Sequence, residues 1–325
     1  MREPSTGGPS AGARFRSLGP WLAETFGRPV HRVALDAGSS CPNRDGTLGR
    51  GGCVYCDVEG SGTGALRSGI DLAEQLERGI RRVKRRHPDC GVIAYFQSYS
   101  NTYVSLERLD EVLAAVEARL AEPIVCVSLA TRPDTLPEEA LERLARLARR
   151  IPVWMELGLE AADDRILREI NRLHTVEDFR SAVRRVREFG LLAIAHAILG
   201  LPGDGRDGAR RTAQCLAESG CEGVKVHQLM VLARTQLAQR WRQGEIDTLE
   251  PETYVAWLAD FVERLSPEQV LHRVTGDAPG DHLLAPRWSV SKNGVRRMLQ
   301  EELERRGTRQ GALAVLGPGY PSPGR

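Results

Sequence analysis

Three cysteines near the amino-terminal end of the chain carry the strongest chemical signal. Cys41, Cys53 and Cys56 are spaced C-x11-C-x2-C in a glycine-rich stretch directly after an apolar run at 30–36. Because such a loop has few apolar side chains to bury, a metal bound by the thiolates would hold it together. Three thiolates suit a [4Fe–4S] cluster with one iron left open, whereas a closed zinc site needs a fourth protein ligand. The spacing alone leaves an iron–sulfur cluster, a zinc ion and no metal as alternatives.

Polar side chains also interrupt runs that are otherwise apolar. Glu156 lies within VWMELGL, His196 within AIAHAIL and His227 within VKVHQL. A carboxylate in an apolar strand is costly unless it is paired or binds a ligand. We therefore expect Glu156 either to contact a cofactor or to form an ion pair with Arg132 or Arg172. Each histidine is either a satisfied core side chain or a site residue.

The elements that must position these residues alternate in a regular order. Short apolar, β-prone runs are followed by stretches with apolar residues at helical spacing, which predicts a parallel, right-handed βα structure. The pattern is typical of a barrel or of a doubly wound sheet, and in a barrel the site lies at the carboxyl ends of the strands. The expected strands are 30–36, 92–97, 124–129, 152–159, 192–199 and 223–229, and the expected helices are 70–86, 105–121, 137–149, 163–170, 176–189 and 208–219.

The alternation stops after residue 230. Helices are expected at 251–265 and 291–306, around a short apolar run at 269–274. We expect a disordered leader over 1–20, a barrel over 21–232, a C-terminal extension packed on it over 233–312, and a flexible tail over 313–325.

Composition excludes several classes of protein. The 325 residues are 41% apolar and 27% charged, with a net charge of +2, which argues against long disorder and against a polyanion-coating protein. No apolar run is long enough to span a membrane. Seven cysteines without a secretory signal indicate reduced thiols and a cytoplasmic protein.

The motif SCPNRDGTLGRGGCVYC resembles the cluster loop of the radical S-adenosylmethionine (radical SAM) enzymes, specifically their YhcC-like branch. Four further motifs follow in order and extend the resemblance over about residues 20–315: TRPD (131–134), WMELGLEAADDRILREINRLHT (154–175), LGLPGD (199–204) and GVKVHQL (223–229). The resemblance implies an α/β fold, a partial (β/α)6 TIM-type barrel with a C-terminal helical and strand extension. It also implies kinship with the radical domain of the Elongator catalytic subunit, which modifies tRNA wobble uridine.

The same resemblance implies the cofactors and their ligands. The [4Fe–4S] cluster would be held by the three cysteines and would cleave S-adenosylmethionine reductively to a 5′-deoxyadenosyl radical, with a reductant such as flavodoxin or ferredoxin. The family's Gly-Gly-Glu type turn is replaced here by residues around Gln97, which weakens the assignment of any one side chain there. The residues expected to bind S-adenosylmethionine are Tyr55, Gln97, Ser98, Glu156, Gly200, Leu201 and His227. The catalytic residues stay unassigned, as do the roles of Glu160 and His196.

The substrate stays unidentified at this point. A basic run from Arg78 to Arg86 holds six cations in nine positions. It is typical either of a solvated helix face or of a contact to a phosphate backbone. The Elongator likeness favours a tRNA substrate, with a small-molecule or protein substrate as the alternative. A non-catalytic zinc-binding module is the alternative of another class.

Overall fold

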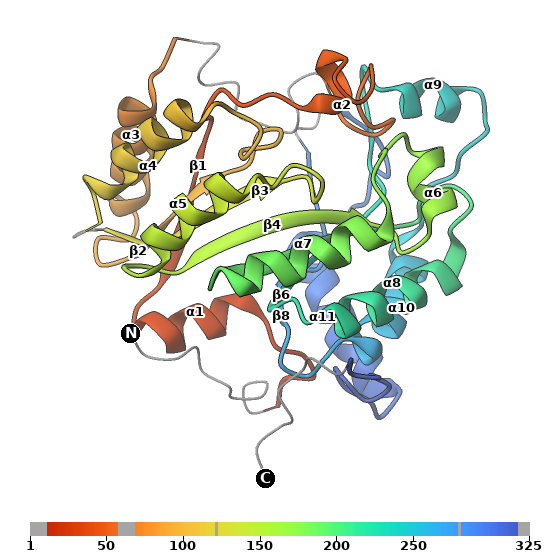
Figure 1. The fold of residues 1–325 in the computed structure, drawn as a ribbon. Coiled ribbons are helices and arrows are strands. Elements are labelled where there is room, and N and C mark those ends of the chain that lie inside the picture. Colours follow the sequence, from red (N-terminus) through yellow and green to blue (C-terminus); the bar gives the residue numbers. More distant parts are fainter. Residues whose placement is uncertain (1–11, 58–68, 121–122, 279–280, 318–325) are drawn as a thin grey trace.

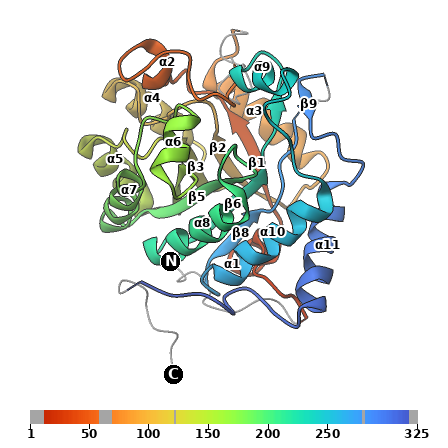
Figure 2. The ribbon, with the colours of Figure 1, turned by 90° about the vertical axis from the view of Figure 1, so that its right-hand side faces the viewer.

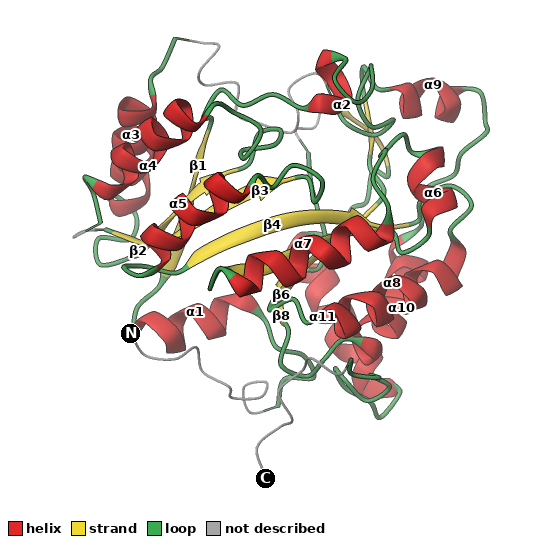
Figure 3. Cartoon of the chain, in the orientation of Figure 1, coloured by secondary structure: helices red, strands yellow, loops and turns green. Residues whose placement is uncertain are grey.

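A curled sheet of parallel strands forms the centre of the molecule, and helices cover its outer face (Figures 1 and 3). The computed structural model describes residues 12–57, 69–120, 123–278 and 281–317. The strands follow one another across the sheet in the order β1-β2-β3-β4-β5-β6-β8. A doubly wound sheet would reverse its order at a switch point, and this sheet does not. The predicted partial barrel is therefore confirmed.

The six predicted strands all form, and each predicted helix of the βα repeats follows its strand. Because most strand positions are apolar, the strands can be covered on both faces, and β4 is buried along its whole length. The strands are β1 Val30–Leu35, β2 Gly91–Phe96, β3 Ile124–Thr131, β4 Val153–Glu160, β5 Leu192–Leu199 and β6 Gly223–Gln228. The helices are α3 Leu72–Lys84, α4 Leu106–Glu117, α5 Glu138–Ala148, α6 Asp164–Glu169, α7 Val176–Glu188 and α8 Gly205–Ser219.

The C-terminal extension contributes a seventh strand to the barrel. The short apolar run expected at 269–274 forms β8, Val270–Arg273, which pairs in parallel with β6. The extension also contains α9 Gln236–Arg242, and a two-stranded sheet of β7 Val231–Leu232 and β9 Leu283–Ala285. In Figure 2 the strands occupy the centre, with α4, α5 and α7 on one side and helices of the extension on the other. The barrel thus has one strand more than the predicted six.

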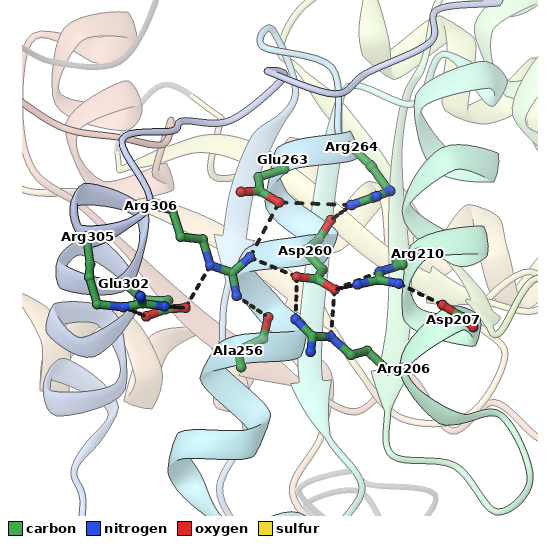
Figure 4. Close-up of polar contacts among 10 residues, drawn as sticks. All are labelled: Arg206, Asp207, Arg210, Ala256, Asp260, Glu263, Arg264, Glu302, Arg305 and Arg306. Carbon is green, nitrogen blue, oxygen red and sulfur yellow. Dashed lines mark hydrogen bonds and ion pairs between the residues drawn. The ribbon is translucent and has the colours of Figure 1, made fainter.

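Two helices of the extension are tied to the barrel through one buried carboxylate (Figure 4). Asp260 lies on α10, Pro251–Arg264, and accepts hydrogen bonds from Arg206 and Arg210 on α8 at 2.7–2.9 Å. Arg306, directly after α11 (Lys292–Arg305), donates to the same carboxylate at 2.8 Å. Three guanidinium groups on one carboxylate therefore fix α8, α10 and the end of α11 relative to one another.

The amino-terminal segment departs from the expected leader. Residues 1–11 lie outside the described part of the chain, but Phe15 and Leu18 are buried, and Ser17 bridges to Leu271 of β8. Helix α1, Leu18–Phe26, follows, and its Trp21 packs on Trp154 of β4 with ring centroids 6.0 Å apart. The expectation of disorder is wrong for residues 14–20, because Phe15 and Leu18 are buried against the barrel and Ser17 pairs with β8.

The first residues of the expected C-terminal tail are also held in place. The Leu313 N–H donates to the carbonyl of Glu263 at 2.7 Å, and Gln214 donates to the carbonyl of Val315 at 2.7 Å. The predicted flexible tail is therefore too long at its amino-terminal end, and residues 318–325 lie outside the described residues. The predicted boundary between barrel and extension at residue 232 stays a prediction.

Candidate active site

A cavity of about 520 Å³ opens at the carboxyl ends of the strands, at the end of the barrel opposite α1. Its wall comes from the cysteine loop after β1, from strands β2 to β8 and from the segment after β8. The lining residues that matter below are Cys41, Arg44, Cys53, Tyr55, Cys56, Tyr95, Gln97, Glu156, Gly158, Glu160, Arg172, His196, His227, Arg273, Asp277 and His282.

The cysteine loop is clamped to the segment between α6 and α7. Its first turn is the short helix α2, Pro42–Asp45, in which Asn43 donates to the Asn171 carbonyl at 2.5 Å. Asn171 donates in return to the Gly52 carbonyl at 2.8 Å, and the Val54 N–H donates to the Ile170 carbonyl at 3.1 Å. Loop residues with little to bury are therefore held by hydrogen bonds to a distant part of the chain.

All three cysteines of the loop line this cavity with free thiols. Burial and the neighbouring Cys53 raise the pKa of the Cys56 thiol to about 11. A thiol buried in this way stays protonated unless a cation, such as a metal ion, favours the thiolate. Across the described ranges, no three His, Cys, Asp or Glu side chains stand together as a ready-made metal site.

Two arginines place positive charge beside these thiols. Arg172 Nη1 lies 3.7 Å from Cys53 Sγ, and Arg44 donates to the carbonyls of Cys56 and Asp57. Buried Arg172 Nε and Asn43 Oδ1, which belong to residues that contact Cys53, have no hydrogen-bond partner in the described structure. Thiols, cations and unpaired polar atoms around one cavity fit a thiolate-bound group that carries negative charge.

The position of Arg172 depends on backbone that few residues adopt. Asn171 and Leu173 flank it with φ of 53° and 62°, in the left-handed region. Arg172 then donates to the Gly158 carbonyl at 2.9 Å and pairs with Glu160 at 3.4 Å. Burial alone would lower the pKa of Arg172, but Tyr55, Cys53 and Glu160 hold it well above its usual value. Arg172 therefore stays charged beside Cys53.

A polar layer crosses the barrel below the cysteines. Register pairs His196 of β5 with Lys225 of β6 and Lys225 with Arg273 of β8. Because His196 and Arg273 line the cavity, this row of side chains points into the barrel. Glu156 lies in the same layer, where its carboxylate accepts hydrogen bonds from Ser128, from His196 at 2.8 Å and from Lys225. Below it, a layer of apolar side chains packs on α1: Ile93, Cys126, Trp154, Ile194 and Val270.

The charges in this layer are set by the pairing. Burial alone would raise the pKa of Glu156, but Lys225 and His196 hold it well below its usual range. Burial lowers the pKa of Lys225 to about 7, although Glu156 opposes the decrease. Burial also lowers the pKa of His196. Burial, together with the positive charge of Arg273, lowers the pKa of His227 to about 3. Because the Gln228 carbonyl can only accept, the His227 Nδ1 that lies 2.8 Å from it carries the proton.

The structure brings most of the predicted site residues together. The three cysteines, Tyr55, Gln97, Glu156 and His227 all line the cavity. Glu156 does have an ion-pair partner, but the predicted partners are wrong: Arg132 pairs with Asp134, and Arg172 pairs with Glu160. Contact with a cofactor stays a prediction for each of these residues.

Three predicted residues lie away from the cavity. Ser98 is buried and its carbonyl accepts from Ser39, while Leu201 packs in the apolar cluster beneath α6. Gly200 turns the chain at φ 89° against Leu249. None of the three is among the described lining residues, so a direct cofactor contact from them would need a rearrangement.

Sequence reasoning missed Lys225 as a site residue. The available signal was its rarity, because the chain has only three lysines among its 45 basic residues and one of them lies inside an apolar strand. A lysine in place of the usual arginine points to a site where a compact ammonium is needed. Arg44 was missed as well, since nothing in a polar loop distinguishes it.

The basic run lies far from the cavity mouth. His87, directly after it, stacks on His31 at the start of β1 with ring centroids 4.1 Å apart. The end of α3 that holds most of the run is therefore at the opposite end of the barrel from the site. Arg78 and Arg81 also form ion pairs with Glu74 and Glu77 one turn earlier.

Comparison with known families assigns the chain. The model of the radical SAM superfamily matches residues 43–216, and that of the radical SAM C-terminal domain matches residues 221–305. The chain belongs to the radical SAM superfamily. It is an enzyme of that superfamily, which rules out the alternative of a non-catalytic zinc module. No helix among the described residues has the length and apolar character needed to cross a membrane.

Relatives of this radical SAM enzyme include proteins of similar length. The chain is 38% identical to the uncharacterized protein YtqA of Bacillus subtilis, in an alignment of 298 residues that covers 92% of each chain. It is 34% identical to the protein YhcC of Escherichia coli K12, over 83% of this chain and 86% of that one. The predicted YhcC-like branch is thereby confirmed.

The kinship with Elongator is confirmed as well. The archaeal Elp3 of Methanocaldococcus infernus superposes with a TM-score of 0.68 at 18% identity, over 86% of this chain and 64% of that one. A tRNA uridine(34) acetyltransferase of Dehalococcoides mccartyi is 29% identical over 54% of this chain and 39% of its own length. The structural match shows a shared fold.

Proposed function

We propose that the cavity holds a [4Fe–4S] cluster on Cys41, Cys53 and Cys56 together with S-adenosylmethionine. When bound, the cluster supplies the electron that cleaves the cofactor to methionine and a 5′-deoxyadenosyl radical. The observation that carries the proposal is that three free thiols from one loop line a single cavity at the carboxyl ends of the strands, where barrel enzymes react.

The protein's own residues would bind the cluster and the cofactor, orient them and shield them from water. Arg172 and Arg44 place positive charge at the thiols, and Arg44 also fixes the loop by donating to the carbonyls of Cys56 and Asp57. Tyr55, within the cysteine loop, and Gln97, directly after β2, both line the cavity. As the family resemblance implies, Tyr55 would pack near the adenine of the cofactor and Gln97 would accept a hydrogen bond from its amino group. Apolar side chains on the wall keep water from a reactive radical: Ile198, Leu229, Met230 and Leu232.

The substrate is a second part of the proposal. The name of the Dehalococcoides mccartyi relative supports a tRNA substrate, although the match covers only 39% of that protein. The paired arginines on α3, turned away from the mouth, do not add to this support. A small-molecule or protein substrate is the alternative. The electron would come from a reductant such as flavodoxin or ferredoxin.

The test is direct. Protein purified and reconstituted without oxygen is expected to contain about four iron and four sulfide per chain and to form 5′-deoxyadenosine from S-adenosylmethionine under reducing conditions. Cys53→Ala should lose both properties, whereas Cys90→Ala, at a buried cysteine outside the cavity, should keep them. A full iron complement in Cys53→Ala would overturn the assignment of ligands.

A further inference from the structure

We propose that Arg273 forms an anion-binding subsite at the floor of the cavity, so that the substrate carries a carboxylate or phosphate group. The inference rests on the proposed function, since it takes this cavity as the place where the substrate binds.

Arg273 is placed deep in the barrel by its strand. It is the last residue of β8 and pairs in register with Lys225 of β6, so it belongs to the polar layer below the cysteine loop. Its side chain lines the cavity, and its buried Nε has no hydrogen-bond partner in the described structure. A guanidinium with unused donors therefore borders the space where a ligand would lie.

The carboxylates on the cavity wall form contacts with groups other than Arg273. Glu156 is held by Lys225 and His196. Glu160 pairs with Arg172, and Asp277 pairs with Lys292 at 2.6 Å. Asp57 belongs to the cysteine loop, above the polar layer. Among the residues that the structure describes, no carboxylate forms an ion pair with Arg273.

A second arginine near Arg273 adds to the excess of positive charge at the cavity floor. Arg32 of β1 lies below the floor with its guanidinium carbon 5.8 Å from the Tyr95 ring centroid, and its Nη2 is also buried without a partner. The polar layer therefore holds Arg273 and Lys225, with Arg32 below them, against the single carboxylate of Glu156. A buried cation without a counter-charge destabilises the folded state. An anion that binds next to Arg273 would remove part of that free-energy cost.

The size of the cavity limits the kind of anion. The proposed cluster and S-adenosylmethionine would take up much of the 520 Å³, so the space left at the floor suits only a small anionic group, whereas the backbone of a folded nucleic acid would have to remain at the mouth. The planar guanidinium can donate two parallel hydrogen bonds to a carboxylate or a terminal phosphate. A small anionic molecule therefore fits the cavity floor better than an uncharged nucleotide base turned into the cavity from a tRNA.

The experiment measures anion binding by the reconstituted enzyme. The melting temperature is followed against inorganic phosphate in one series and malonate in another, with chloride keeping the ionic strength constant. We expect one of the two anions to raise the melting temperature of the wild type by binding the folded state. Arg273→Gln should weaken that apparent affinity at least tenfold, and the exposed Arg287→Gln should leave it unchanged.

The outcomes distinguish a phosphate-bearing substrate from a carboxylate-bearing one, and both from the absence of an anion subsite. A response to phosphate alone identifies a phosphate-bearing substrate, and a response to malonate alone identifies a carboxylate. If Arg273→Gln does not fold, Arg273→Lys keeps the charge but loses the two-pronged donor, and should still bind several-fold more weakly. Equal responses in wild type and the Arg273 variants, or no response in wild type, would overturn the subsite.

A cofactor assay on the same samples keeps the two proposals apart. Cleavage of S-adenosylmethionine without substrate is measured in wild type, Arg273→Gln and the exposed Arg287→Gln, of which Arg287→Gln is the variant expected to match wild type. Loss of cofactor cleavage in Arg273→Gln would show that the arginine serves the cofactor and would overturn the substrate subsite. A wild type without cluster or cleavage that still binds phosphate through Arg273 would instead contradict the proposed function alone.

Discussion

Lys225 on β6 and Glu156 on β4 form an ion pair across His196, which lies on the strand between them. Both side chains of the pair are at most 2% exposed. Removing only one charge would leave the other buried without a partner, and that loss typically costs about 3–5 kcal/mol. The pair is therefore a constraint on the fold as well as part of the cavity floor.

The first prediction concerns this pair. Glu156→Gln should lower the free energy of unfolding by up to about 3–5 kcal/mol at pH below 7, because the protonated Lys225 loses its carboxylate, and by less at higher pH, where Lys225 is neutral. The double variant Glu156→Gln/Lys225→Met should recover most of the loss, since it buries no unpaired charge. Denaturant titration of the three proteins measures both effects. A double variant no more stable than the single one would contradict this account.

The double variant also tests whether Glu156 contacts the cofactor. If it binds S-adenosylmethionine, loss of a charge-assisted hydrogen bond should weaken binding by about 1.5–3 kcal/mol, or roughly ten- to a hundredfold, while the cluster stays intact. We expect that loss in an equilibrium binding assay of the reconstituted double variant. An unchanged affinity in the double variant, together with a loss of stability in the single variant Glu156→Gln, would assign Glu156 a structural role only.

The second prediction concerns the space that Arg172 needs beside the cysteines. A Cβ on Gly158 would collide with Arg172 Nη2 and with the Glu160 carboxylate. Gly158→Ala should therefore push the guanidinium away from Cys53, reduce the iron retained after reconstitution and cost about 1–3 kcal/mol of stability. Gly19→Ala is the matched control, because that position has open space around it. Normal iron content in Gly158→Ala would show that Arg172 is dispensable for the loop.

The third prediction concerns Asp260 and pH. Burial alone would raise the pKa of Asp260, but hydrogen bonds from Arg206, Arg306 and Arg210 hold it well below its usual range. A depressed folded-state pKa stabilises the protein at pH above the unfolded value of about 3.9, and this contribution is lost as pH falls below it. Asp260→Asn should therefore cost about 2–3 kcal/mol at neutral pH, allowing for partly exposed arginines.

The measurement for Asp260 is denaturant unfolding at neutral and acidic pH. The difference between wild type and Asp260→Asn should shrink as pH falls below about 4. Asp207→Asn, which removes an exposed partner of Arg210, should change stability by less than about 1 kcal/mol. A difference for Asp260→Asn that does not depend on pH would mean that its charge contributes nothing to the clamp.

The fourth prediction concerns the basic run on α3. Arg82 and Arg85 are exposed near the end of α3 that faces away from the cavity mouth. Replacing both by Gln should leave tRNA binding and its salt dependence unchanged, because RNA that reaches the cavity would not follow that end of the barrel. Binding curves over a range of salt concentrations provide the measurement. A log–log slope flatter by about 0.7–0.9 per arginine would instead identify phosphate contacts.

Local sequence patterns were sufficient to predict the repeating architecture and the cysteine centre. Apolar strands and amphipathic helices recur in order, so their periodicity predicts a parallel βα structure without knowledge of any long-range contact, and the family resemblance favours the barrel over the doubly wound sheet. Cys41, Cys53 and Cys56 lie on one short loop, and their proximity follows from chain connectivity. Both features depend on residues that are near one another in the sequence.

The surroundings of the cysteine centre could not be predicted in the same way, because they depend on contacts between distant parts of the chain. The Lys225–Glu156 pair, the approach of Arg172 to Cys53 and the unpaired position of Arg273 depend on strand register and on turns between elements far apart in the chain. The run at 269–274 was too short to show that it adds a seventh strand, and α1 was hidden in a polar leader. Local patterns predict elements, but a buried charge finds its partner only when the closed barrel brings distant strands together.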